Sequence, residues 1–315
     1  MTNPFIFSDC FSVTLRRGIL LLLTMAVSAC TTVIPVAPGS DSKTVTAVPS
    51  VDVPASKRTP RLGLALGGGA ARGFAHVGVL QVLEEAGIKA DLVVGTSAGS
   101  LVAALYASGK TGAQLQMVAE TMEEATITDW TIPLLGRGMM RGDALGRYVN
   151  AQTGARRIED FKIPLGIVAT DLHSGQGVLF QRGDVGTAVR ASSSVPSLFE
   201  PVRIGNREYV DGGLVSPVPV HYARQMGAEY VVAVDISSLP ESGKTGDMFQ
   251  ILMQTFTIMG KSINAFELRD ADLVVRPALA NVGSADFGSR RRSIEAGRLA
   301  MQQALPKLRA ALAAQ

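Results

Sequence analysis

Two apolar runs in this chain each end at small residues and continue directly into a helical pattern. Residues 61–69 read RLGLALGGG and precede FAHVGVLQVLEEAG, whose apolar positions recur at helical spacing before a glycine stop. Residues 91–95 read DLVVG and lead through a second small-residue turn into SLVAALYASG. Strands that alternate with helices fold as a largely parallel sheet covered on both faces. We therefore predict an α/β fold.

The same alternation continues toward the C-terminus. Further strand patterns occupy residues 163–172, 177–181, 207–211 and 230–237, and helical patterns occupy 184–192 and 217–227. The part from about residue 246 gives a helix, a strand and a terminal helix after the short linker SLPESGKTG. We interpret it as the flank of the same domain, which gives one domain over 61–315 with a core over 61–237 and a flank over 246–315.

The composition suits a folded globular protein, with 47% hydrophobic and 18% charged residues. The net charge is only +3, and no block of Lys and Arg lies beside aromatic residues. Nucleic acid is therefore a poor candidate partner.

The N-terminal region has the pattern of a secretory signal. Two arginines precede residues 18–27 (GILLLLTMAV), a run of h-region length that is too short to span a bilayer. It ends in VSAC at Cys30, which resembles the lipobox of bacterial lipoproteins. We predict a signal peptide over 1–29 and a lipidated Cys30 that holds the chain on a membrane. The alternatives are an ordinary signal peptide or an uncleaved anchor. Thr31, rather than Asp, follows the cysteine. By resemblance to the sorting rules of Gram-negative lipoproteins, this favours the periplasmic face of the outer membrane.

Residues 31–60 are rich in Pro, Ser, Thr and Val and show no helical or strand periodicity. We expect 30–60 to be a flexible tether that begins at the lipidated Cys30. The two cysteines are Cys10 and Cys30, and Cys10 leaves with the signal peptide. The mature chain then has no partner for a disulfide and no cysteine-based metal site.

The second small-residue turn is a candidate nucleophile site. Gly95-Thr96-Ser97-Ala98-Gly99 matches G-x-S-x-G and lies between a strand and a helix, where glycines relieve the crowding around a strained serine. The helix N-terminus beneath it favours developing negative charge. The alternative is that Ser97 merely caps the helix.

A serine nucleophile needs a base. His76, His173 and His221 each lie in a setting more typical of a structural or exposed histidine. Asp211 is the better candidate, because it ends a strand and is followed by Gly212-Gly213, which leave room for close approach. An Asp that serves turn geometry is the alternative.

The first small-residue turn, Gly67-Gly68-Gly69, is a candidate oxyanion hole. It lacks the register of G-x-G-x-x-G and the Gly-Lys-Ser/Thr of a Walker loop, whereas an oxyanion hole needs only preorganised N–H groups. We expect the amides of Gly68 and Gly69 to hold the oxyanion. Arg72 either orients this loop through its carbonyls or meets a phosphate or carboxylate of the substrate.

Together these stretches resemble the patatin-like phospholipase family of bacteria. The matching segments are GGGAARGFAHVGVL (67–80), GTSAG (95–99), ASSSVPSLFEPV (191–202) and DGG (211–213). The resemblance implies a three-layer α/β/α fold and a Ser-Asp dyad without histidine, with Ser97 as nucleophile and Asp211 as proton acceptor. Many members carry a glycine where Ala70 stands, which leaves this loop less free.

The resemblance implies a lipid acyl hydrolase that acts on phospholipids or other fatty-acyl esters. The alternatives are a broad carboxylesterase or thioesterase on soluble esters, and a lipoprotein scaffold without activity. The sequence has no calcium loop of the EF-hand kind, so we expect neither a metal nor another cofactor. Residues 129–140 hold the only Trp and form either a lid or acyl-chain wall, or ordinary core packing.

Overall fold

The computed structural model describes residues 59–130, 137–238, 246 and 248–313. The predicted signal peptide, Cys30 and the predicted tether up to residue 58 lie outside the described residues. Their processing and lipidation stay predictions.

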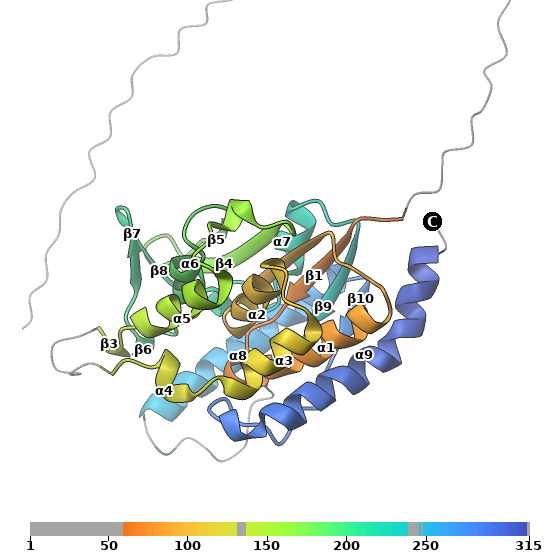
Figure 1. Ribbon diagram of the computed structural model, residues 1–315. Helices are drawn as coiled ribbons and strands as arrows, with labels where there is room; N and C mark the ends of the chain where they lie inside the picture. Colours follow the sequence, from red (N-terminus) through yellow and green to blue (C-terminus); the bar gives the residue numbers. More distant parts are fainter. Residues whose placement is uncertain (1–58, 131–136, 239–245, 247, 314–315) are drawn as a thin grey trace, which may run out of the picture. The chain divides into compact units, whose positions relative to one another are not determined.

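A mixed, mostly parallel sheet runs through the described domain (Figure 1). Its strands follow the order β10-β9-β1-β2-β4-β8-β7, with β5 paired to β4 outside this path. They are β1 (Leu62–Leu66), β2 (Leu92–Thr96), β4 (Leu165–Asp171), β5 (Gly177–Phe180), β7 (Val202–Ile204), β8 (Arg207–Asp211), β9 (Tyr230–Val234) and β10 (Leu273–Val275). β1, β2, β4, β9 and β10 pair in parallel, whereas β5 and β8 are antiparallel to β4. The predicted α/β class is confirmed.

Helices cover both faces of the sheet, as the residue alternation along β1 requires. Leu62, Leu64 and Leu66 belong to one apolar core, which includes α1 (Phe74–Glu85), α2 (Ala98–Ala107), α3 (Gly112–Thr121) and α9 (Arg290–Ala313). Ala65 belongs to a second core with α7 (Val220–Gln225) on the opposite face. Small residues let α7 and the residues after it approach the sheet: a Cβ at Gly63 would lie 3.6 Å from Ala223 Cβ of α7 and 2.5 Å from Ala228 Cβ. The predicted three-layer fold is confirmed.

The C-terminal flank adds to this frame. After α8 (Met248–Glu267), β10 pairs in parallel with β9 and extends the sheet. α9 then packs along α1, as the blue and orange helices of Figure 1 show. Two glycines allow the helices to cross closely, because a Cβ at Gly78 would lie 1.9 Å from Ile294 O and one at Gly297 would lie 2.0 Å from Ala75 O.

Several short elements were not predicted from the sequence. They are α3, α4 (Glu124–Ile127), β3 (Gly138–Met140), α5 (Asp143–Thr153) and β6 (Ser197–Phe199), together with β7. β3 and β6 pair in parallel and form a separate two-stranded sheet. Of the segment considered as a lid or as core packing, residues 131–136 lie outside the described residues. Trp130 is 69% exposed and therefore does not belong to the core, whereas Met140 is buried.

Candidate active site

The sheet topology brings the predicted nucleophile and base together. β2 runs parallel to β4 and ends at Thr96, opposite Val168. β8 runs antiparallel to β4 and ends at Asp211, opposite Ala169. β5 overlaps both of these registers and occupies the other edge of β4. The carboxyl ends of β2 and β8 therefore meet head to head on one edge, which places Ser97 beside Asp211.

Ser97 stands on a strained turn between β2 and α2. Its backbone angles are φ 53° and ψ −123°, a left-handed conformation that costs a non-glycine residue about 1–3 kcal/mol. The flanking glycines permit this turn, since a Cβ at Gly95 would lie 2.4 Å from Gly99 O and one at Gly99 would lie 2.1 Å from Leu66 O. The Thr96 hydroxyl fixes the turn by donating a hydrogen bond to Ser216 O. The sequence pattern G-x-S-x-G thus has a steric basis.

The hydroxyl of Ser97 makes no capping bond to α2. Ser97 Oγ instead donates a 2.7 Å hydrogen bond to Asp211 Oδ2, so the helix-cap alternative is wrong. The other carboxylate oxygen, Oδ1, accepts from Gly213 N at 2.6 Å and so serves the turn as well. A Cβ at Gly212 would lie 2.2 Å from Val168 O, which explains a glycine directly after the Asp.

Burial controls the basicity of Asp211. The residue is 6% exposed, and loss of hydration raises the pKa of its carboxyl from 3.8 to about 6. The hydrogen bonds from Gly213 and Ser97 act in the opposite direction and only partly offset this rise. A carboxylate with a pKa of about 6 is a stronger base than an ordinary Asp, and it is largely ionised at neutral pH.

The glycine loop after β1 lies against the nucleophile. A Cβ at Gly68 would lie 3.1 Å from Ser97 Cβ. The amides of Gly67 and Gly68 donate to Val234 O and Pro217 O, at 3.0 and 2.9 Å. Within the described part of the chain, the Gly69 amide has no such acceptor. Of the two amides expected to hold an oxyanion, Gly68 is therefore engaged in this structure and Gly69 is available.

Two residues that follow the loop set its conformation. Ala70 holds φ at 50°, a left-handed angle that glycine adopts without steric cost. Arg72 is buried, and its Nε donates to Gly69 O at 3.4 Å while Nη2 donates to Ser238 Oγ at 2.7 Å. These contacts favour the loop-orienting alternative for Arg72.

The three histidines occupy structural or exposed positions. His76 is fully buried, and its Nε2 lies 2.8 Å from Gly67 O. Burial lowers the pKa of His76 to about 4, so the ring is neutral, and its Nε2–H donates this hydrogen bond to the glycine loop. The side chain of His173 is 69% exposed, and His221 is exposed on α7. In the described residues, none of the three forms a hydrogen bond with Ser97 or Asp211.

Comparison with known proteins assigns the family. Residues 64–224 match the model of the patatin-like phospholipase family. The chain belongs to this family. An NTE family protein of Mycobacterium tuberculosis, described as uncharacterized, is 34% identical over 190 residues, which cover 60% of this chain and 52% of that protein. Patatin-like phospholipase domain-containing protein 6 of Mus musculus is 32% identical over 233 residues, covering 71% of this chain and 16% of that protein.

The patatin-like fold is also found among solved structures. VipD from Legionella pneumophila has a TM-score of 0.58 at 15% identity, covering 79% of this chain and 67% of that one. This likeness supports the fold alone. The chain spans about half the length of the mycobacterial relatives, at 52% and 46%, so their activity as whole proteins does not transfer directly.

One functional contact of this patatin-like domain was missed in the sequence. Ser192, fully buried at the end of α6 (Val185–Ser192), accepts a 2.9 Å hydrogen bond from Ser97 N and donates to Val168 O at 2.5 Å. Two residues later, Ser194 O accepts from Asp211 N at 2.9 Å. The last residue of α6 and the segment that follows it therefore hold the backbone of both Ser97 and Asp211. Its similarity to the family segment 191–202 was the available signal.

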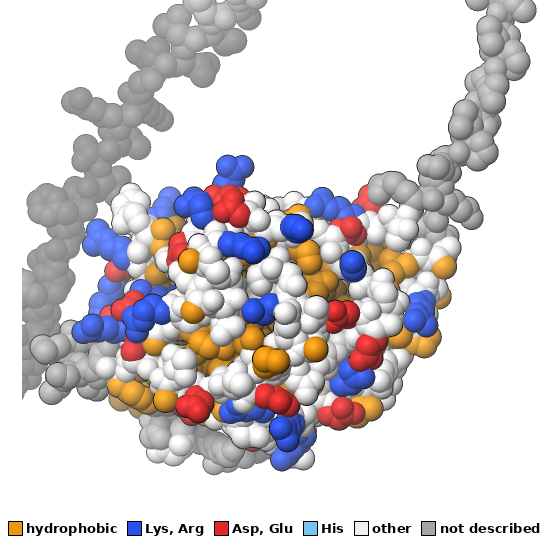
Figure 2. All heavy atoms as spheres, viewed as in Figure 1, with side chains coloured by type: hydrophobic (Ala, Val, Ile, Leu, Met, Phe, Trp, Pro, Cys, Tyr) orange, Lys and Arg blue, Asp and Glu red, His pale blue; other side chains and the backbone are white. Residues whose placement is uncertain are grey.

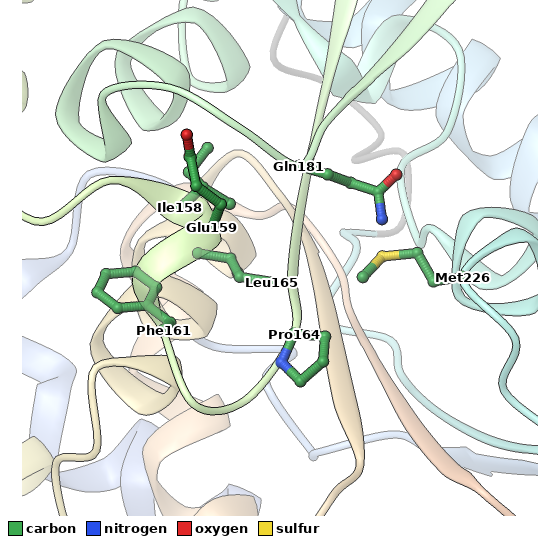
Figure 3. A pocket seen from close by; sticks show the side chains of 7 residues that line it. All are labelled: Ile158, Glu159, Phe161, Pro164, Leu165, Gln181 and Met226. Atoms are coloured by element: carbon green, nitrogen blue, oxygen red, sulfur yellow. The ribbon is translucent and has the colours of Figure 1, made fainter.

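The pocket of Figure 3 is separate from this site. It is lined by Ile158, Glu159, Phe161, Pro164, Leu165, Gln181 and Met226. It lies where β4 begins, whereas Ser97 and Asp211 meet farther along β4, at Val168 and Ala169. In the described part of the chain, no helix has the length and apolar character needed to cross a bilayer, and no cluster of three or more His, Cys, Asp or Glu forms a metal site.

Proposed function

We propose that this domain hydrolyses fatty-acyl esters of phospholipids through an acyl-enzyme, using Ser97 and Asp211 as a dyad. The observation that carries the proposal is the 2.7 Å hydrogen bond from the strained Ser97 hydroxyl to the buried Asp211 carboxylate. Membership of the patatin-like phospholipase family supports lipid esters as the substrate class.

In the first half-reaction, Ser97 Oγ attacks the ester carbonyl carbon and its proton passes to Asp211 Oδ2. The carbonyl oxygen becomes an oxyanion, which the Gly69 amide and the N-terminus of α2 stabilise; one such donor contributes about 3 kcal/mol in a transition state. The C–O bond to the leaving group breaks, and the alkoxide takes the proton back from Asp211. The products are an acyl ester on Ser97 and the free alcohol.

In the second half-reaction, Asp211 takes a proton from a water molecule as this attacks the acyl carbon. The second tetrahedral intermediate collapses, Ser97 Oγ recovers the proton, and the fatty acid leaves. Arg72 acts on both half-reactions as a positioning residue, because it holds the carbonyl of Gly69, the residue whose amide we expect to stabilise the oxyanion.

The test is hydrolysis of phospholipid vesicles and of soluble nitrophenyl esters by purified wild type, Ser97→Ala and Asp211→Asn. We expect vesicle lipids to be cleaved by wild type and both variants to lose activity while keeping a native circular dichroism spectrum. Activity on short soluble esters alone would instead support a broad esterase. Full activity in either variant would refute the dyad.

We also propose that Cys30 carries a lipid anchor on the periplasmic face of the outer membrane. The lipobox-like VSAC and Thr31 support this proposal. Intact-mass analysis of the mature protein tests it: we expect an N-terminal acylated cysteine, and Cys30→Ser to release the protein from membranes. A mature chain that begins elsewhere without a lipid would contradict it.

A further inference from the structure

One side of α8 is apolar and exposed. Met248, Ile251, Ile258, Met259 and Phe266 are 46–86% exposed. With Thr255 and Ser262 between them, these residues recur at steps of three and four, apart from the adjacent pair Ile258 and Met259, so they lie along one side of the helix. We call this set of seven residues the α8 face. Figure 2 shows hydrophobic side chains at the lower left of the molecule, in the area where Figure 1 places α4 and one end of α8.

The other side of α8 is attached to the loop that follows Asp211. α8 contacts the turn at Gly212–Leu214, and a Cβ at Gly260 would lie 3.6 Å from Pro217 Cγ. Asn264 is buried. Glu267 accepts hydrogen bonds from Ser216 Oγ at 2.6 Å and from His221 N at 3.2 Å. The α8 face therefore belongs to the same end of the domain as the dyad and points away from the protein.

The charges around the α8 face suit an anionic surface. Lys261 and Glu267 are the only ionisable residues in the sequence of α8, and Glu267 is engaged with the domain. Lys261 is exposed, and the guanidinium of Arg269 lies over the Phe266 ring, 4.9 Å from its centroid. Apolar side chains flanked by cations match the interface of an anionic bilayer, where the former enter the acyl boundary and the latter meet phosphates.

We propose that the α8 face docks this domain on anionic phospholipid bilayers. The choice of a bilayer as the partner rests on the proposed function, because a phospholipid hydrolase must reach substrate that is held in a membrane. Docking through α8 brings the bilayer surface close to the loop 212–217. This loop follows Asp211, and its Pro217 O accepts a hydrogen bond from the Gly68 amide. The bilayer then lies at the end of the sheet where the dyad acts.

The test uses the full chain with Cys30→Ser, so that acylation does not contribute. Flotation with phosphatidylethanolamine/phosphatidylglycerol vesicles measures partition in the Ser97→Ala background, where no lipid is consumed. Ile258→Asp combined with Phe266→Asp replaces two apolar side chains of the α8 face by charges, and Leu299→Asp on α9 is the control for a charge placed at an exposed apolar position elsewhere, since Leu299 is 50% exposed. We expect the double variant to lower the partition coefficient at least about tenfold and the control to leave it unchanged.

Activity is then measured in the chain that retains Ser97. The double variant should lose vesicle hydrolysis in proportion to partition and keep hydrolysis of nitrophenyl butyrate. Unchanged partition, or an equal loss with Leu299→Asp, would overturn the docking proposal. So would a wild-type dimer that the double variant converts to monomer, because the α8 face would then bind a second copy. A wild type that docks but cleaves neither substrate would refute the proposed function and leave the docking intact.

Discussion

Replacing Asp211 by Asn should stabilise the protein while it abolishes activity. The Asp211 carboxyl has a pKa of about 6 in the folded state and 3.8 in the unfolded chain, mainly because burial removes the hydration that stabilises its ionised form. Asn keeps an oxygen to accept from Gly213 N and carries no charge. At about 1.36 kcal/mol per pKa unit, a difference of about 2 units makes the ionised Asp211 cost about 3 kcal/mol of folding stability.

The sign follows from proton linkage. Between pH 3.8 and 6 the folded state binds more protons at Asp211 than the unfolded state does, so wild-type stability from this group falls as pH rises. Below this window the cost vanishes, and above it the cost is fully present. The stability of Asp211→Asn relative to wild type should therefore rise by about 2 kcal/mol from pH 4 to pH 7.

Urea unfolding of both proteins at several pH values between 4 and 8 measures this difference, and other titrating groups cancel between them. Ser97→Ala serves as the control, because it is inactive yet keeps the buried carboxyl. A stability difference that does not change with pH, or that changes in the opposite direction, would refute the argument that burial raises the pKa of Asp211.

Four further predictions follow from the site. Ser192→Ala should lower kcat by about 10- to 100-fold with little change in KM, because the Ser97 amide loses its acceptor; steady-state kinetics check this against Ser194→Ala, whose hydroxyl bonds only Arg190 O in the described structure. The rate should fall as pH drops through about 6, because Asp211 then gains a proton. If His76→Gln removed this acidic limb from the pH–rate profile, the limb would belong to His76 and the prediction would be wrong. Gly99→Ala should cost about 1–3 kcal/mol and most of the activity, because the new Cβ overlaps Leu66 O; urea unfolding and ester assays measure both. EDTA should leave ester hydrolysis unchanged, and loss of activity restored by Ca²⁺ would contradict the expected metal-independent chemistry.

Much of the frame could be predicted because its signals are local. The apolar runs at 61–66 and 91–95, each followed by a glycine turn and a helical pattern, identify buried parallel strands without further information. The atoms that require glycine at position 95 lie within a few residues of Ser97, and the one that requires glycine at position 99 is Leu66 O, at the end of the neighbouring strand β1. The absence of a suitably placed histidine was also visible in the sequence.

Other features depend on distant contacts and could not be predicted. The head-to-head meeting of β2 and β8 follows from the registers of both strands with β4, which no local pattern encodes. The engagement of the Gly68 amide depends on Pro217, about 150 residues away in the chain. The short strands β3 and β6 have only three residues each, too few for a periodicity to show.

The most direct test of the dyad is the labelling of Ser97 by a fluorophosphonate, followed by mass spectrometry of the labelled peptide. The reagent reports an activated serine without requiring knowledge of the lipid substrate. We predict a single adduct on Ser97 in wild type, with a labelling rate that falls below pH 6 and is lost in Asp211→Asn. An adduct on another serine, or equal labelling of Ser97 when Asp211 is replaced, would contradict the Ser97–Asp211 dyad.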